Sequence, residues 1–269
     1  DRAVAFPSLD QWLSGRCSGT DMRKVIGIVG EGPIDQMVLK AAINRITGES
    51  HIYRNIQPEQ DMLGEFGNGW KGVYRWCETN AELIPALFSA ISPALDLLII
   101  QMDGDVARKE KEVHCRCEST ICPKKNEESP LVCRQLKEGN CPVIIPCRDH
   151  VNSPEGYRIH LEQLLRSLIG DPASKEKIVI VIPCDSTDAW TVAAYEEDID
   201  DIEAVVDPWE RIISLKKEYH GIRIPGHKKN TAIYRLFLPQ IINNWDSITG
   251  HCGSARKLET DIRQWAMKS

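Results

Sequence analysis

The chain has 269 residues, of which 42% are hydrophobic and 27% are charged, the ordinary composition of a globular protein. This length fits one compact domain with insertions or two small domains. The formal net charge of −6 argues against a protein that coats nucleic acid with a uniformly basic surface. It does not exclude a nucleic-acid enzyme, because an acidic metal site and a local basic groove can coexist.

No apolar run reaches the length of about 18 residues that a membrane helix needs. Residues 1–22 lack the basic start and the apolar run of a signal peptide. We therefore expect no membrane association and a cytoplasmic protein.

The first regular elements are predicted shortly after this segment. Residues 24–29 form a short apolar run rich in β-branched side chains, which indicates a buried strand. Gly30-Glu-Gly-Pro33 interrupts the run, and Asp35 is a suitable cap for the helical pattern that follows. The order of strand, tight turn and helix is typical of the opening of an α/β unit.

The next part of the chain combines a glycine-rich segment with a second apolar run. We interpret residues 59–74 as a loop near a site or a bent hairpin, because glycine, aromatic and acidic residues are mixed there. A helix is expected over 80–91, with Asn80 or Thr79 as its cap and Pro93 as its stop. Residues 96–102 are predicted to form a second buried strand, which ends at Asp103-Gly-Asp105.

Residues 106–142 differ from the rest because they are charged, rich in cysteine and poor in apolar periodicity. We interpret them as an insertion. A strand is expected over 142–146, followed by an amphipathic helix over 154–169 that Gly170 ends. The side of this helix expected to be buried carries Ile159, Leu161, Leu164, Leu165 and Leu168.

The last third begins with a third buried strand, over 177–182. A turn over 183–188 leads into a helix over 189–195, and the acidic run 196–203 reads as a solvated connector or helix face. From Pro208 onward the pattern is mainly helical, with an interruption at 221–226.

Alternating buried strands and helices predict an α/β fold with a mostly parallel, Rossmann-like sheet flanked by helices. The expected organisation is an N-terminal extension (1–23), an α/β domain (24–205) that contains the insertion, and a helical C-terminal region (206–269) packed on the same domain.

Acidic residues follow all three predicted strands. They are Glu31 after the first, Asp103 and Asp105 after the second, and Asp185 and Asp188 after the third. Sites in open α/β sheets form outside the carboxyl ends of the strands, so these side chains are expected to converge. A divalent cation would offset their repulsion, and hard oxygen ligands suit Mg²⁺ or Mn²⁺.

The Asp103-Gly-Asp105 spacing adds a geometric argument, because residues i and i+2 of an extended strand point to the same side. Both carboxylates would then reach one ion or two neighbouring ions. The alternative interpretation is that acidic residues at strand ends are turn formers or helix caps. That reading fits Glu31 least well, since it stands between two glycines.

Two of these segments resemble the two motifs of a known family and occur in the same order along the chain. The strand ending in Gly30-Glu-Gly-Pro33 before a helix looks like the first motif of the TOPRIM fold, and the strand ending in Asp103-Gly-Asp105 looks like its second. TOPRIM domains occur in topoisomerases, bacterial primases and nucleases of the OLD type. The segments 182–190 and 226–229 also resemble stand-alone TOPRIM proteins that accompany ATPases in bacterial defence loci.

The resemblance covers roughly residues 24–265, with two departures. Ile34 stands where the family often has a hydroxyl residue, and Asp188 stands where a glutamate is expected.

The resemblance implies a Mg²⁺-dependent nuclease that acts on DNA or RNA, serves antiviral defence and is controlled by an ATPase partner. Glu31, Asp103 and Asp105 would bind the catalytic metal, and Asp185 or Asp188 would complete a second metal position. Lys228 or Lys229 would neutralise charge that develops on the phosphate. Hydrolysis by water is favoured over strand passage, because the chain has no further domain to supply a tyrosine nucleophile.

Two other functions remain as alternatives. One is a TOPRIM-like binding or regulatory subunit without catalysis. The other is a phosphatase of the haloacid-dehalogenase type, which also uses Asp-x-Asp after a strand. The latter leaves Gly30-Glu-Gly-Pro33 unexplained, and Ala107 occupies the place where that family usually has Thr or Val. A phosphate-binding P-loop is excluded, because no Gly-Lys-Ser/Thr follows Gly30.

Ten cysteines are present, and their clustering in the insertion favours metal over disulfides in a chain without a secretion signal. A tetrahedral Zn²⁺ would hold a segment too polar to build a core. The expected ligands are Cys115, Cys117, Cys122 and Cys133, with Cys141 as substitute and His114 as a further candidate. The alternative is that these are free thiols, which is what we expect of Cys77, Cys147, Cys184 and Cys252.

The aromatic residues are predicted to be mainly structural. Six tryptophans are expected as core or interface anchors, with Trp70 as the best candidate for exposure. His220 and His227 are expected to be surface residues.

Overall fold

A computed structural model describes residues 23–58, 66–109, 150–172, 174–196, 198–199, 201–214, 218–226 and 229–268. Within these residues the chain folds around a four-stranded sheet with the strand order β2-β1-β3-β4. The three strand pairings are all parallel. The strands are β1 (Val25–Val29), β2 (Ile52–Gln57), β3 (Leu97–Gln101) and β4 (Ile178–Val181). This confirms the predicted α/β class, and the arrangement is consistent with a Rossmann-like fold.

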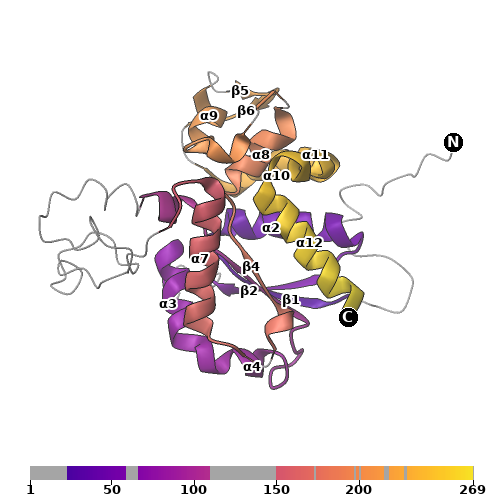
Figure 1. Ribbon diagram of the computed structural model, residues 1–269. Coiled ribbons are helices and arrows are strands. Elements are labelled where there is room, and N and C mark those ends of the chain that lie inside the picture. The colour runs from indigo at the N-terminus through magenta and orange to yellow at the C-terminus, as the bar shows by residue number, and fades with distance from the viewer. Residues whose placement is uncertain are drawn as a thin grey trace, which may run out of the picture.

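Helices cover both faces of the sheet (Figure 1). One face packs against α3 (Trp70–Asn80), α4 (Ile84–Leu87) and α7 (Pro154–Ile169). The other packs against α2 (Pro33–Thr47) and α12 (Gly253–Lys268), and its apolar cluster continues into α8 (Asp188–Tyr195), α9 (Pro208–Ser214), α10 (Thr231–Asn243) and α11 (Trp245–His251). Strand residues alternate between these two clusters, which explains why the strands are apolar throughout.

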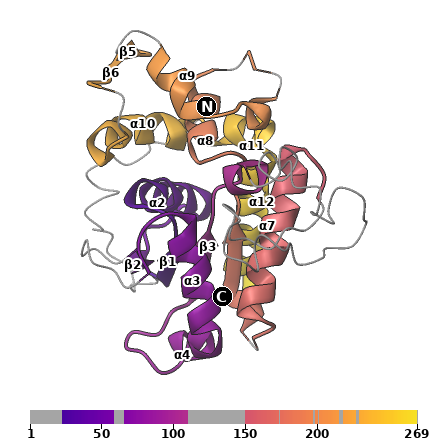
Figure 2. The ribbon, with the colours of Figure 1, turned by 90° about the vertical axis from the view of Figure 1, so that its left-hand side faces the viewer.

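A small hairpin of β5 (Glu218–Tyr219) and β6 (Ile222–Arg223) lies beside α9 at the top of the molecule (Figures 1 and 2). Short 3₁₀ turns lie at Ala81–Leu83, Lys175–Lys177 and Ile202–Ala204. No helix in the described ranges is long and apolar enough to cross a membrane.

The three strands expected from apolar runs and the helix over 154–169 are confirmed. Ser153 caps α7, because its hydroxyl accepts the Gly156 N–H at 3.1 Å. Gly170 follows with a φ of 71°, a conformation that favours glycine. One helix residue was placed wrongly: Ile159 is 43% exposed, and Ile169 contributes to the buried side instead.

The segment between residues 51 and 91 corrects the sequence interpretation. Strand β2 was missed, and along it only Gln57 is buried, as expected for an edge strand that lacks a continuous apolar run. Part of the expected loop is helical, because α3 begins at Trp70, while residues 59–65 lie outside the described range. The helix expected over 80–91 is wrong, since only a 3₁₀ turn and the four-residue α4 follow α3.

Two local expectations near the acidic residues are also wrong. Helix α2 begins at Pro33 with Gly32 as its cap, so Asp35 lies in the first turn rather than at the cap. The extended geometry expected of residues 103–105 does not occur. Strand β3 ends at Gln101, and residues 105–109 are helical.

Gly104 joins the carboxyl ends of β3 and β4. Its N–H donates to the Pro183 carbonyl at 2.8 Å, and the Asp105 N–H donates to the Asp185 carbonyl at 3.0 Å. A Cβ atom at position 104 would lie 2.8 Å from the Pro183 carbonyl oxygen, closer than real Cβ contacts allow. The close backbone approach that glycine permits therefore serves the contact between two strand ends.

We predict that Gly104→Ala destabilises the protein by about 1–3 kcal/mol, because the added methyl group forces the two backbones apart. The matched control is Gly250→Ala in α11, where a Cβ meets nothing within 4 Å. That change should be stabilising by about 0.5–1 kcal/mol, since alanine is the better helix residue. Urea denaturation of both variants provides the measurement. Equal midpoints for the two would contradict the close-packing account.

Candidate metal centre at the carboxyl ends of the strands

Glu31 and Asp103 lie next to each other, as their positions after two neighbouring strands predicted. The Asp103 N–H donates to Glu31 Oε1 at 2.7 Å. The β1–β3 register, which pairs Val29 with Ile100, places both residues just beyond the same edge of the sheet. Both residues are half-buried, so the carboxylates have restricted contact with solvent.

Gln101, which the sequence interpretation did not select, lies between these two residues. It is fully buried at the end of β3. Its side-chain oxygen Oε1 accepts the Glu31 N–H at 3.0 Å, and its side-chain nitrogen Nε2 donates to Asp103 Oδ1 at 2.8 Å.

Asp105 belongs to the helical turn that follows. Its carboxylate is paired with Lys109 one turn later. It is close enough to Glu31 and Asp103 for its charge to raise the pKa of both. The three predicted ligands thus belong to one electrostatic cluster, although Asp105 approaches it from a helix rather than from an extended strand.

A second group of polar residues adjoins this cluster from α2 and α8. Asp188 is 1% exposed, and its Oδ2 accepts hydrogen bonds from the Ser186 hydroxyl at 3.0 Å and from Lys229. Its Oδ1 is buried without a hydrogen-bond partner in the described part of the chain. Asp35, which the sequence analysis considered only as a helix cap, accepts a hydrogen bond from the Thr187 hydroxyl at 2.7 Å.

Asp185 is engaged elsewhere. Its Oδ1 accepts from Arg108 Nε at 2.6 Å, and its Oδ2 accepts the Asp207 N–H at 2.7 Å. Both oxygens therefore have partners, and the residue adopts a left-handed φ of 57°. Of the two candidates for a further acidic ligand, Asp188 is the one with an oxygen left over.

Burial and mutual repulsion change the acidity of these groups. Burial, followed by the charges of Asp35 and Asp105, raises the pKa of Glu31 to about 8. Burial and the neighbouring Asp188 raise the pKa of Asp35 to about 6. The pKa of Asp103 is raised by burial and then by Asp35, Glu31 and Asp105.

Lys229 offsets part of this negative charge. Burial lowers its pKa, but attraction to Asp188, Asp103 and Asp35 outweighs burial and raises the pKa overall. Among the described residues, the acidic groups of this region still outnumber the basic ones. The basic residues are Lys229, Arg108 and Lys109, and the acidic residues are Glu31, Asp35, Asp103, Asp105, Asp185 and Asp188.

The donor set fits a hard divalent cation in its chemistry. Carboxylate oxygens are the ligands of Mg²⁺ and Mn²⁺, and the unpartnered Asp188 Oδ1 and the raised pKa of Glu31 mark a place short of positive charge. Within the described ranges, however, no three His, Cys, Asp or Glu side chains are already grouped so as to hold one ion. Binding of one ion by three carboxylates would therefore require a third side chain, such as that of Asp105, to rotate toward Glu31 and Asp103.

Several predicted residues lie outside the part of the chain that the structure describes. They are Cys115, Cys117, Cys122, Cys133, Cys141, Cys147, His114, Lys228 and His227, together with the strand expected over 142–146. Cys77, Cys184 and Cys252 are free and buried, as expected. Trp70 is half-buried and His220 is exposed, whereas five other tryptophans are buried: Trp76, Trp190, Trp209, Trp245 and Trp265.

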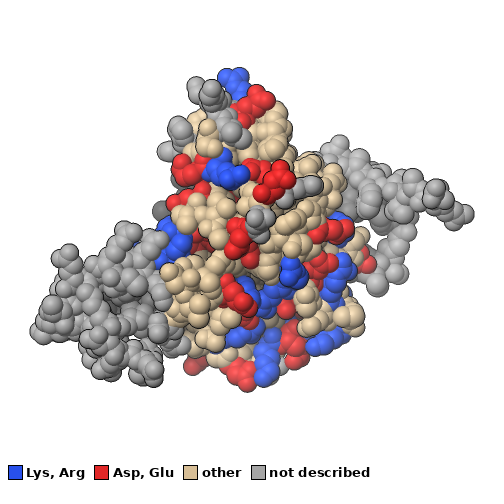
Figure 3. Space-filling model, turned by 45° about the horizontal axis from the view of Figure 1, so that its top comes forward, with Lys and Arg blue, Asp and Glu red and all other residues tan. Residues whose placement is uncertain are grey.

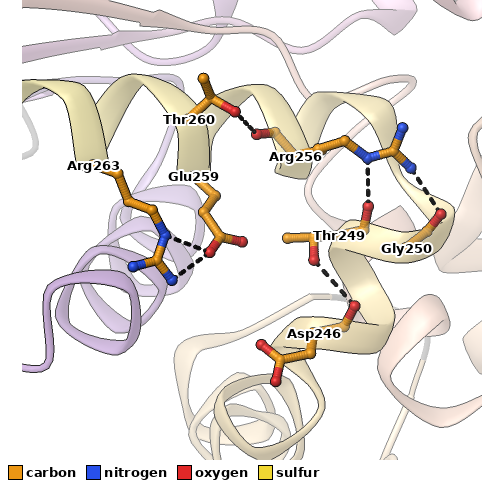
Figure 4. A pocket seen from close by; sticks show the side chains of 7 residues that line it. All are labelled: Asp246, Thr249, Gly250, Arg256, Glu259, Thr260 and Arg263. Atoms are coloured by element: carbon orange, nitrogen blue, oxygen red, sulfur yellow. Dashed lines mark hydrogen bonds and ion pairs between the residues drawn. The ribbon is translucent and has the colours of Figure 1, made fainter.

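A surface pocket of about 440 Å³ lies elsewhere, between α11 and α12 (Figure 4). None of the clustered carboxylates lines it. Its charged side chains are already engaged: Arg256 donates to the Thr249 and Gly250 carbonyls, and Arg263 pairs with Glu259. On the face shown in Figure 3, acidic and basic side chains are intermixed rather than gathered into one broad patch.

Comparison of the chain with protein-family models, with curated proteins and with solved structures finds no match. We therefore infer the function from the site itself.

The raised pKa of Glu31 predicts a pH dependence of stability in the absence of divalent cations. The folded state favours the protonated carboxyl, so this contribution to stability is full below a pH of about 4.5 and is lost as the pH rises through about 8. In the presence of a chelator, the melting temperature of the unmodified protein should therefore fall as the pH rises from about 4.5 to about 8. The melting temperature of Glu31→Gln should fall less over the same range. Parallel pH profiles for the two proteins would contradict the assignment.

Proposed function

We propose that this protein is a Mg²⁺-dependent nuclease of the TOPRIM type that hydrolyses phosphodiester bonds of DNA or RNA. The observation that carries the proposal is the meeting of Glu31 and Asp103 at the ends of β1 and β3, joined by a 2.7 Å hydrogen bond. These residues come from the two segments that resemble the TOPRIM motifs. The parallel sheet supports the proposal, because ligand sites in such sheets form at this edge.

The residues divide into two roles. Glu31, Asp103 and Asp105 would hold the cation, and Asp188 with Asp35 would provide carboxylates for a second position. Mg²⁺ bound there supplies positive charge that polarises a phosphate and lowers the pKa of a coordinated water. An excess of carboxylates suits this role, because one or two divalent ions would cancel the repulsion and allow an anionic substrate to approach.

Lys229 is the residue best placed to meet the phosphate. Its ammonium group is paired with Asp188, yet the side chain is 39% exposed and can be reached from solvent. It also lies 5.9 Å from the centre of the Trp209 ring, a cation–π contact that restrains its position. A cation held in this way can neutralise charge that develops on the phosphate during cleavage.

The biological setting is part of the same proposal. We infer a role in antiviral defence and control by an ATPase partner from the resemblance to stand-alone TOPRIM proteins. A structural Zn²⁺ in the cysteine-rich insertion is a separate proposal, which metal analysis of the reduced protein would test.

The nuclease assignment predicts cleavage that depends on the paired carboxylates. Purified protein should cleave at least one of plasmid, single-stranded DNA and tRNA with Mg²⁺, alone or together with the proposed ATPase partner. Glu31→Gln combined with Asp103→Asn should lower the rate by at least about 100-fold, since metal stabilisation is worth several kcal/mol and about 1.4 kcal/mol is a factor of ten.

The matched control is Asp246→Asn, which removes a carboxylate that is 83% exposed on α11 and pairs with Arg45 outside the cluster. It should leave cleavage unchanged. Cleavage that persists in the double variant would overturn the assignment. A native protein that binds the cation but cleaves nothing would favour the alternative of a regulatory TOPRIM-like subunit.

A further inference from the structure

Glu31, Gln101 and Asp103 form a closed ring of hydrogen bonds. The Glu31 N–H donates to Gln101 Oε1 at 3.0 Å, Gln101 Nε2 donates to Asp103 Oδ1 at 2.8 Å, and the Asp103 N–H donates to Glu31 Oε1 at 2.7 Å. Each residue gives one hydrogen bond and receives one. The ring links the backbone of each acidic residue to the side chain of another ring member.

The packing around Gln101 leaves its amide little freedom. The side chain is fully buried, and the main chain pairs with Val181 of β4. Gly30 allows the amide to lie against the end of β1, because a Cβ atom at position 30 would come within 3.1 Å of Gln101 Oε1. Both polar ends of the amide are committed, so its orientation is fixed by the two residues that it joins.

The ring has a consequence for Asp103. Its Oδ1 is held by Gln101, whereas its Oδ2 accepts no hydrogen bond in the described part of the chain. A carboxylate held in this way presents one oxygen rather than two. Octahedral Mg²⁺ and Mn²⁺ accept single oxygens, whereas Ca²⁺ takes more ligands and often binds a carboxylate through both oxygens.

We propose that Gln101 is a positioning residue that fixes Asp103 for one-oxygen coordination and so favours Mg²⁺ or Mn²⁺ over Ca²⁺. The inference rests on the proposed metal-dependent function but not on cleavage. Its physical basis is the general one for metal centres, in which partners behind the ligands set ligand orientation and their removal weakens binding by about 10–100-fold.

The test is a titration of the whole protein with Mn²⁺ and, separately, with Ca²⁺, followed by calorimetry. In Gln101→Met, which keeps the volume but removes both hydrogen bonds, Mn²⁺ should bind about 10–100-fold more weakly. Ca²⁺ binding should weaken less, because Asp103 is then free to offer both oxygens. The ratio of the two affinities therefore shifts toward Ca²⁺, a change that general destabilisation would not produce.

Gln36→Met is the matched control. Gln36 is also a buried glutamine, but its amide donates to the Gln57 carbonyl and not to a carboxylate. It should lose comparable stability and keep the native affinities. If Gln101→Met is unfolded at the assay temperature, Gln101→Leu replaces it with the same expectation.

Native affinities and an unchanged ratio in the Gln101 variants would overturn the inference while leaving the proposed function intact. The same shift in Gln36→Met would also overturn it. A native protein that binds no Mn²⁺ would overturn the proposed function and the inference together.

Discussion

The parallel pairing of β1 with β3 is the constraint on which the rest of this molecule depends. Parallel neighbours end at the same edge of a sheet, so Glu31 and Asp103 must meet there although 72 residues separate them. Two apolar clusters, one on each face, hold the strands in register. Burial of these apolar residues stabilises the fold and so offsets the repulsion between carboxylates that the strand pairing brings together.

Charge is the second consequence of this topology. Half-buried carboxylates repel each other, and the protein offsets the repulsion with protons, with main-chain N–H groups and with cations. Glu31 shows the first two, through its raised pKa and its bond from Asp103. Lys229 supplies the third beside Asp188. Under the proposed function, a divalent cation would replace the protons.

Sequence reasoning succeeded where the signal was local. Strands β1, β3 and β4 are continuous apolar runs bounded by glycine, proline or acidic residues, and α7 has a serine cap and a glycine stop. Strand β2 was missed because an edge strand with one buried residue leaves no apolar run. Helix α3 was missed because its first turn follows a glycine-rich stretch that resembles a loop.

The candidate site could also be predicted only in part from the sequence. The convergence of Glu31 and Asp103 followed from strand order alone, whereas Gln101 and Asp35 were not foreseen. Their partners lie 70 and 152 residues away, and the contacts depend on register and helix placement that no local pattern records. The choice between Asp185 and Asp188 likewise needed the structure, because Arg108 binds Asp185 from a helical turn in the segment that was interpreted as an insertion.

The central claim is that Glu31 and Asp103 share a divalent cation. A crystal grown or soaked with Mn²⁺ tests it most directly, because the anomalous signal locates the ion without reference to activity. The account predicts a peak about 2.1 Å from one carboxylate oxygen of each residue. Crystals saturated with Mn²⁺ that show ions only at the surface, and none between Glu31 and Asp103, would contradict it.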